Sequence, residues 1–117
     1  MENQNGKGES QDDIEKMIKD YQILEEQIRG YSIQLQDLQL QKSEAETAKA
    51  EVEKAAGKIY LTIGGVIVET DKEKALANLK EKSENLDMKI QMVNKQLSSL
   101  KSKEKAIKDK LSSLQQQ

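Results

Sequence analysis

Residues 58–70 read KIYLTIGGVIVET, and this stretch decides the fold. Apolar and polar residues alternate on the N-terminal side of Gly64–Gly65, and β-branched residues follow it. Two such runs joined by two glycines predict a β-hairpin with a two-residue turn, because both turn positions then take positive φ. In this register Ile63 faces Val66. The apolar side chains that share one face of the hairpin are Ile59, Leu61, Ile63, Val66 and Val68.

A heptad pattern precedes the hairpin. Apolar residues are spaced alternately by three and four, which predicts a helix with a coiled-coil seam. The members of this seam are Ile14, Met17, Tyr21, Leu24, Ile28, Tyr31, Leu35 and Leu38. Lys42 and Lys49 interrupt the repeat, and Gly57 is a stop signal. We predict a helix over residues 12–57 and a disordered polar tail over residues 1–11, MENQNGKGESQ.

A second heptad pattern follows the hairpin and predicts a helix over residues 71–117. Thr70, with Glu73 three residues later, has the spacing of a capping box. The seam comprises Leu76, Leu79, Ser83, Leu86, Ile90, Val93, Leu97, Leu100, Glu104, Ile107, Leu111 and Leu114.

The two seams are mirror images about Gly64: Ile14 lies as far before it as Leu114 lies after it. Two helices that run back along each other need this symmetry to keep their seams in phase. The distribution of charge also favours antiparallel pairing. The segment Met1 to Ile28 holds eight acidic and three basic residues, and the segment Met88 to Gln117 holds seven basic and two acidic ones. We predict a mainly α fold, an antiparallel two-helix coiled coil with a β-hairpin at its elbow, forming one domain over residues 12–117.

An isolated two-stranded hairpin is only marginally stable in water, and its free edges and apolar face favour pairing with strands of other chains. We therefore expect the chain to assemble through its hairpin, with the apolar set Ile59, Leu61, Ile63, Val66 and Val68 packed against other subunits.

Composition excludes several classes of function. The chain has no Cys and no His, so thiolate nucleophiles, zinc–thiolate sites and imidazole catalysis are absent, and we expect no enzyme, cofactor or metal site. We expect no membrane span, because no run of about 20 apolar residues exists. No signal peptide is evident, and a cytoplasmic location is expected. The Lys-rich C-terminal part lacks interleaved aromatic residues, so we expect no nucleic-acid binding.

Residues 58–82, KIYLTIGGVIVETDKEKALANLKEK, resemble the central segment of archaeal β-class prefoldin subunits. The single hairpin fits the β-class, since the α-class carries two. The polar tail and Gly64–Gly65 depart from the pattern. The resemblance implies a hexamer with α-class subunits and further β copies, whose hairpins build a barrel body. It also implies an ATP-independent holdase that binds unfolded client proteins at its coiled-coil tips and passes them to a group II chaperonin.

On this reading, the client-binding residues are those nearest the free ends of the helices: Ile14, Met17, Ile18, Leu111 and Leu114. Ile18 lies beside the seam, and Met17 is adaptable in shape. The alternative is that these residues only complete the seam. The rival function is a non-catalytic scaffold subunit of a prefoldin-like complex. In such a subunit we expect the seam residues to stay packed up to the ends of both helices.

Overall fold

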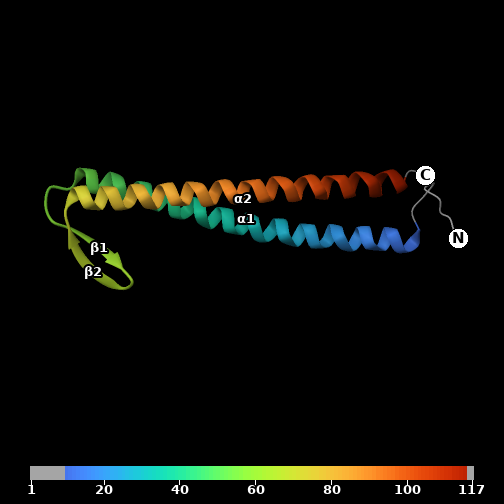
Figure 1. Cartoon of the computed structure of the whole chain (residues 1–117), viewed down its shortest axis with the longest axis horizontal. Coiled ribbons are helices and arrows are strands. Elements are labelled where there is room, and N and C mark those ends of the chain that lie inside the picture. Colours follow the sequence, from blue (N-terminus) through green and yellow to red (C-terminus); the bar gives the residue numbers. More distant parts are fainter. Residues whose placement is uncertain (1–9, 116–117) are drawn as a thin grey trace. The chain divides into compact units, whose positions relative to one another are not determined.

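The computed structural model describes residues 10–115 of the chain. The predicted class is confirmed, since two long helices flank a two-stranded antiparallel hairpin (Figure 1). The elements are α1 (Gln11–Lys54), β1 (Ile59–Ile63), β2 (Val66–Thr70) and α2 (Lys72–Gln115). They form two compact units, an arm unit of Met1–Gln34 with Val93–Gln117 and a hairpin unit of Leu35–Met92. Most of the predicted tail, residues 1–9, lies outside the described residues.

Helix α1 begins at a serine cap that the sequence analysis assigned to the tail. The Ser10 hydroxyl oxygen accepts a hydrogen bond from the Asp13 amide at 3.1 Å, and the Ser10 carbonyl accepts one from the Ile14 amide at 3.0 Å. A serine in this position satisfies amide donors that have no partner within the helix. The helix therefore starts at Gln11, one residue before the predicted boundary.

Helix α1 ends at Lys54, three residues before the predicted stop at 57. The Ala55 amide bonds the Val52 carbonyl at 3.1 Å, an i→i−3 bond that tightens the last turn. The Lys72 ammonium then donates to the Glu53 carbonyl at 2.6 Å. A lysine from α2 thus satisfies one of the carbonyls that the end of α1 leaves without a helical partner.

The hairpin has the predicted register, with Ile63 opposite Val66 and Leu61 opposite Val68. Gly64 and Gly65 take φ values of 57° and 82°, and no described residue other than glycine has positive φ. These values suit a type I′ turn, whose twist matches that of the flanking strands.

The predicted cap of the second helix is wrong by one residue. The Lys74 amide donates to the Asp71 carboxylate at 2.7 Å, and the Ala75 amide donates to the Asp71 carbonyl at 3.0 Å. Thr70 instead pairs with Ile59 as the last residue of β2. Because the backbone of Thr70 is paired within the sheet, the next residue, Asp71, caps the helix.

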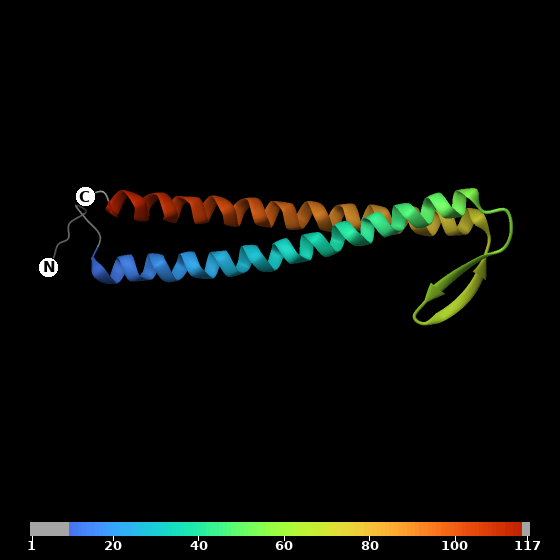
Figure 2. The same cartoon turned by 180° about the vertical axis from the view of Figure 1, so that it is seen from behind.

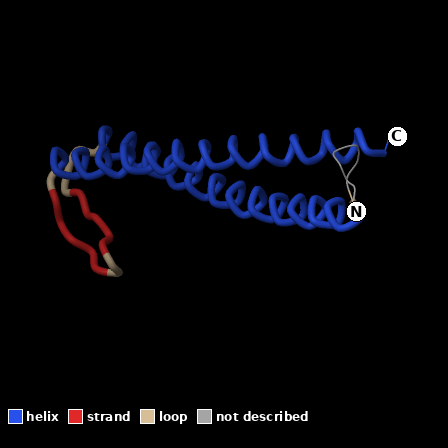
Figure 3. Tube along the Cα trace, turned by 45° about the vertical axis from the view of Figure 1, so that its right-hand side comes forward, coloured by secondary structure: helices blue, strands red, loops and turns tan. Residues whose placement is uncertain are grey.

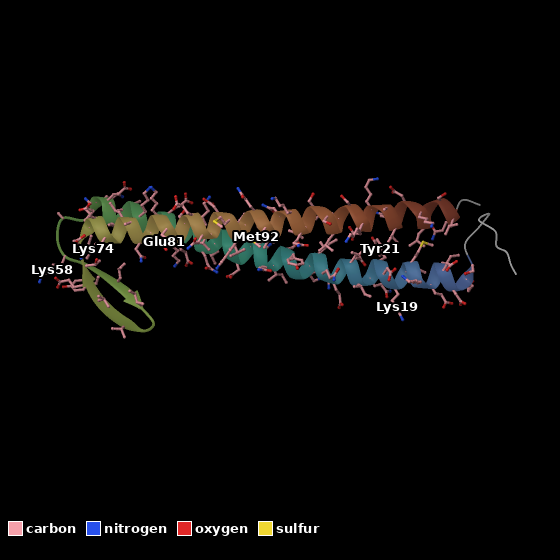
Figure 4. All side chains as sticks on the ribbon, viewed as in Figure 1. Lys19, Tyr21, Lys58, Lys74, Glu81 and Met92 are labelled. Atoms are coloured by element: carbon pink, nitrogen blue, oxygen red, sulfur yellow. The ribbon has the colours of Figure 1, made fainter. Side chains whose placement is uncertain are left out.

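In the arm unit, the N-terminal part of α1 and the C-terminal part of α2 run side by side in opposite directions (Figure 2). Every predicted seam residue in this unit is buried or half-buried. The most deeply buried are Leu24, Val93, Leu97 and Leu100. Figure 4 shows Tyr21 between the two helices and Lys19 on the outer side of α1. The heptad pattern therefore identified the packed faces correctly.

In the hairpin unit, the C-terminal part of α1 packs on the N-terminal part of α2 through small and apolar residues. Ala45, Leu38, Ala75, Leu79 and Leu86 are all buried. The hairpin leaves the ends of the helices and projects away from them, with its turn farthest out (Figure 3). Its base is therefore better covered than its turn, as the exposure of individual residues shows.

Candidate functional site

The first candidate surface is the apolar face of the hairpin. Ile59, at its base, is buried, and Leu61 is half-buried. Ile63 and Val66, beside the turn, are 58% and 60% exposed, and Val68 is also exposed. Water therefore contacts most of a face that the sequence analysis assigned to subunit contacts.

Both long edges of the hairpin lack a neighbouring strand. The sheet has two strands, so within the described residues the outer edge of β1 and that of β2 have no strand partner. Unpaired backbone amides and carbonyls at a sheet edge are a template for pairing with another chain. An open sheet edge is the geometry that strand addition requires, and this hairpin has two of them.

The opposite face of the hairpin carries an apolar residue that the sequence reasoning missed. Ile67 is 71% exposed there, and Tyr60 is exposed on the same face. These two are diagonal neighbours, because Thr62 pairs with Ile67 and Tyr60 pairs with Glu69. The signal was present in the sequence, since the run Val66–Ile67–Val68 does not alternate with polar residues.

The second candidate surface is the free end of the arm unit. Ile14 and Met17 of α1 and Leu111 and Leu114 of α2 are half-buried, and the antiparallel pairing brings both pairs to the same end. Ile18 is 43% exposed, as expected for a residue beside the seam. Along α2, seam burial thus decreases from Leu100 to Leu114, whereas along α1 of this unit Leu24 is buried and the seam residues on both sides of it are half-buried.

A shallow groove lies along one side of the arm unit and involves residues that the sequence analysis did not select. Asp20, Ile23 and Leu24 of α1 form one wall, and Lys103, Ala106 and Ile107 of α2 form the other. The groove has a volume of about 460 Å³. The lining residues come from both helices, as expected where α1 and α2 of the arm unit lie side by side.

Within residues 10–115, the groups with a shifted pKa are lysines that form ion pairs with aspartates. A side-chain hydrogen bond from Lys16 to Asp20, with their charge attraction, raises the pKa of Lys16, and Asp109 does the same for the pKa of Lys105. Both pairs lie four residues apart on one helix. Such pairs are typical of solvated helix faces.

Among residues 10–115, no group of three or more acidic side chains is placed to hold a metal ion. The same part of the chain contains no helix whose length and apolar character suit a membrane crossing.

A hairpin set between two antiparallel helices with heptad seams defines a coiled-coil subunit of helix–hairpin–helix type. The chain belongs to the prefoldin subunit family, whose family model matches residues 15–117. In the solved structures, it is similar to the prefoldin β subunit from Thermococcus strain KS-1, with a TM-score of 0.80 and 30% identity over 97% of this chain and 96% of that chain.

The curated relatives also carry the β designation. The chain is 41% identical to prefoldin subunit beta of Pyrococcus abyssi over 54 residues and 43% identical to that of Pyrococcus furiosus over 53 residues. These alignments span 46% and 45% of the length of the two relatives, so less than half of each is matched in sequence. The resemblance to β-class subunits is therefore confirmed.

Proposed function

We propose that this chain is an ATP-independent holdase subunit that binds non-native proteins at the free end of its arm. The observation that carries the proposal is that the apolar seam residues at the free end of the arm unit are only half-buried, with seam burial along α2 falling from Leu100 to Leu114. Helix ends fray, because their last turns lack hydrogen-bond partners. Apolar side chains in frayed turns are available to the exposed core residues of an unfolded client.

The proposed complex joins this chain to α-class prefoldin subunits and to further copies of itself through the hairpin. Its exposed apolar face and two open edges support this role. Each arm would hold a client weakly, and several arms on one body would act together by avidity. The complex would work in the cytoplasm and deliver its clients to a group II chaperonin.

The test is light scattering from a chemically denatured client diluted into buffer with the complex of this chain and its α-class partner. Full-length arms are compared with arms shortened at both helix ends, and the mass of each complex is measured. We expect both complexes to assemble and only the full-length one to suppress aggregation. If both assemble and neither suppresses aggregation, the chain is a scaffold subunit and the holdase proposal fails.

A further inference from the structure

The hairpin is attached to the two helices by two connections of different length. Residues 55–58 join α1 to β1, and Asp71 alone joins β2 to α2. Asp71 is fixed to α2, because its carboxylate accepts the Lys74 amide at 2.7 Å and its carbonyl accepts the Ala75 amide at 3.0 Å. Strand β2 and helix α2 therefore meet at a well-defined joint.

The longer connection is held by few contacts of its own. Among the described residues, its one backbone hydrogen bond outside the strands runs from the Ala55 amide to the Val52 carbonyl. Ala56, Gly57 and Lys58 are exposed, and the space beside Gly57 is open. The backbone of this connection therefore does little to fix the end of α1 relative to the hairpin.

Lys72, the first residue of α2, joins the end of α1 to this joint. Its ammonium donates a hydrogen bond of 2.6 Å to the carbonyl of Glu53, in the last turn of α1. The two residues are 19 positions apart, and the hairpin lies between them in the chain. The contact therefore closes the base of the hairpin and holds the end of α1 beside the joint of β2 with α2.

The charge of Lys72 is unfavourable for its own helix and favourable for the other one. The first turn of a helix carries positive partial charge, so an acidic residue such as Glu73 suits it and a lysine does not. The last carbonyls of a helix lack helical partners and carry negative partial charge. The Lys72 ammonium lies at that end of α1. The benefit of a cation at position 72 therefore comes from its contact with α1.

Two neighbouring lysines make contacts that are local. The Lys58 ammonium lies 3.6 Å from the Glu69 carboxylate at the base of the hairpin, and the Lys74 ammonium lies 4.0 Å from the Asp71 carboxylate at the start of α2. Both lysines lie at the hairpin end of the helices (Figure 4). Lys74 is two residues from Lys72 and its side chain does not reach α1, so it provides a matched control.

We propose that Lys72 is a positioning residue for subunit assembly. By holding the last turn of α1 at the joint of β2 with α2, it fixes the direction in which the hairpin leaves the helices. The free chain then presents the two open edges of the hairpin in the orientation that other subunits bind. The inference rests on the proposed assembly through the hairpin.

A fixed direction favours assembly because the hairpin loses less conformational freedom when it meets its partners. One hydrogen bond at the surface makes a small difference to one chain. In the proposed complex several copies take part, and the contributions of separate copies to the free energy of assembly add. Loss of the Lys72 contact should therefore weaken assembly while the stability of each free chain changes little.

The first measurement compares the assembly of three variants. Lys72→Met removes the ammonium and keeps the aliphatic part of the side chain, Lys72→Arg keeps a cationic donor, and Lys74→Met is the control. Each chain is mixed with the α-class partner and diluted, and mass photometry gives the concentration at which half of the complex has dissociated. We expect this concentration to rise about tenfold for Lys72→Met, because the copies act together, and to stay near the natural value for the other two.

The second measurement follows the direction of the hairpin in the free chain. The natural chain has no cysteine, so spin labels attach only at two introduced positions, Glu51→Cys near the end of α1 and Thr62→Cys in β1. Both positions are exposed. Double electron–electron resonance gives the distribution of distances between the labels. We expect Lys72→Met to broaden this distribution and Lys72→Arg and Lys74→Met to preserve it, with the urea midpoint of the helices unchanged in all three.

An unchanged distance distribution in Lys72→Met would overturn the positioning role, whatever happens to assembly. A broadened distribution with unchanged assembly would also overturn it, because the direction of the hairpin would then not matter to the partners. Equal weakening of assembly by Lys74→Met, or a fall in the urea midpoint that accounts for the weakening, would show a general loss of stability instead. If the natural chain does not assemble with the α-class partner, the proposed assembly is wrong and the positioning role fails with it. A complex that assembles as expected and holds no client would disprove the holdase proposal alone.

Discussion

The Lys42 ammonium lies 2.6 Å from the Asp87 carboxylate and joins α1 to α2 within the hairpin unit. Lys42 is half-buried at a heptad position where the sequence pattern alone suggested an interruption. The interruption is therefore an interhelical ion pair. Polar residues at single seam positions fix the register of a coiled coil at some cost in stability, and this pair is well placed to do so.

Replacing Lys42 by leucine should stabilise the chain and relax its register. The substitution restores an apolar seam position, and it leaves Asp87 exposed enough to be solvated. We expect the midpoint of thermal unfolding, followed by circular dichroism, to rise by roughly 5 °C. Asp87→Asn, the matched control, should change it by much less. A lower midpoint for Lys42→Leu would show that the ion pair outweighs the gain in apolar burial.

The same pair predicts a pH dependence in the alkaline range. The hydrogen bond to Asp87, with the attraction of its charge, raises the pKa of Lys42 above its ordinary value of 10.5. A raised pKa in the folded state means that the stabilisation is complete below pH 10.5 and is lost as the pH rises through the folded-state pKa.

We therefore expect the difference in urea stability between the natural chain and Lys42→Met to be constant from neutral pH to about 10 and to shift against the natural chain above pH 10.5. The other lysines titrate in both proteins and cancel in the difference. A difference that does not change between pH 10 and pH 12 would contradict this account of the pair.

The cap of α2 gives a prediction that separates two neighbouring residues. Asp71→Ala removes the carboxylate that accepts the Lys74 amide, and it should lower the free energy of unfolding by about 1 kcal/mol. Thr70→Val keeps the backbone pairing with Ile59 and should cost much less. Urea denaturation of the two variants measures both values. A larger loss of unfolding free energy for Thr70→Val would show that the threonine is the cap.

Charge on the apolar face of the hairpin should prevent the proposed assembly. Leu61 and Val68 are cross-strand partners, so aspartate at both places two carboxylates side by side on the proposed interface. We expect the mass from multi-angle light scattering to fall to that of free chains, with helix content retained. Thr62→Asp, on the other face of the hairpin, is the control. An unchanged mass for the double variant would place the assembly surface elsewhere.

Polar substitutions at the arm end should reduce holding and spare assembly. In the variant Ile14→Ser, Met17→Ser and Leu114→Ser, three half-buried apolar side chains are lost at the free end of the arm unit. Several-fold more complex should be needed for half-suppression of client aggregation, because each arm contributes to avidity. The complex should keep its mass. Unchanged suppression would mean that these residues only complete the seam.

Most of the fold followed from local patterns. Gly64–Gly65 between two β-branched runs fixes the hairpin, because few other residue pairs accept two positive φ values. The seams followed from spacing, since a heptad repeat specifies which side of a helix is covered.

What the sequence did not reveal depends on three-dimensional contacts. Thr70 and Asp71 are both capping residues, and the choice between them is made by where strand pairing with Ile59 ends. The partner of Lys42 depends on the pairing of two helices. Likewise, the exposure of Ile23 and of Ile67 follows from how the elements pack, and it cannot be read from the sequence alone.

The central claim is that non-native proteins contact the free end of the arm. A photo-crosslinking residue at Ile18, exposed beside the seam of the arm unit, is compared with one at Leu40, an exposed residue of the hairpin unit. Each complex is mixed with a denatured client and irradiated, and the client adducts are quantified. The account predicts strong capture from position 18 and little from position 40. Equal capture from both positions, or capture mainly from position 40, would contradict it.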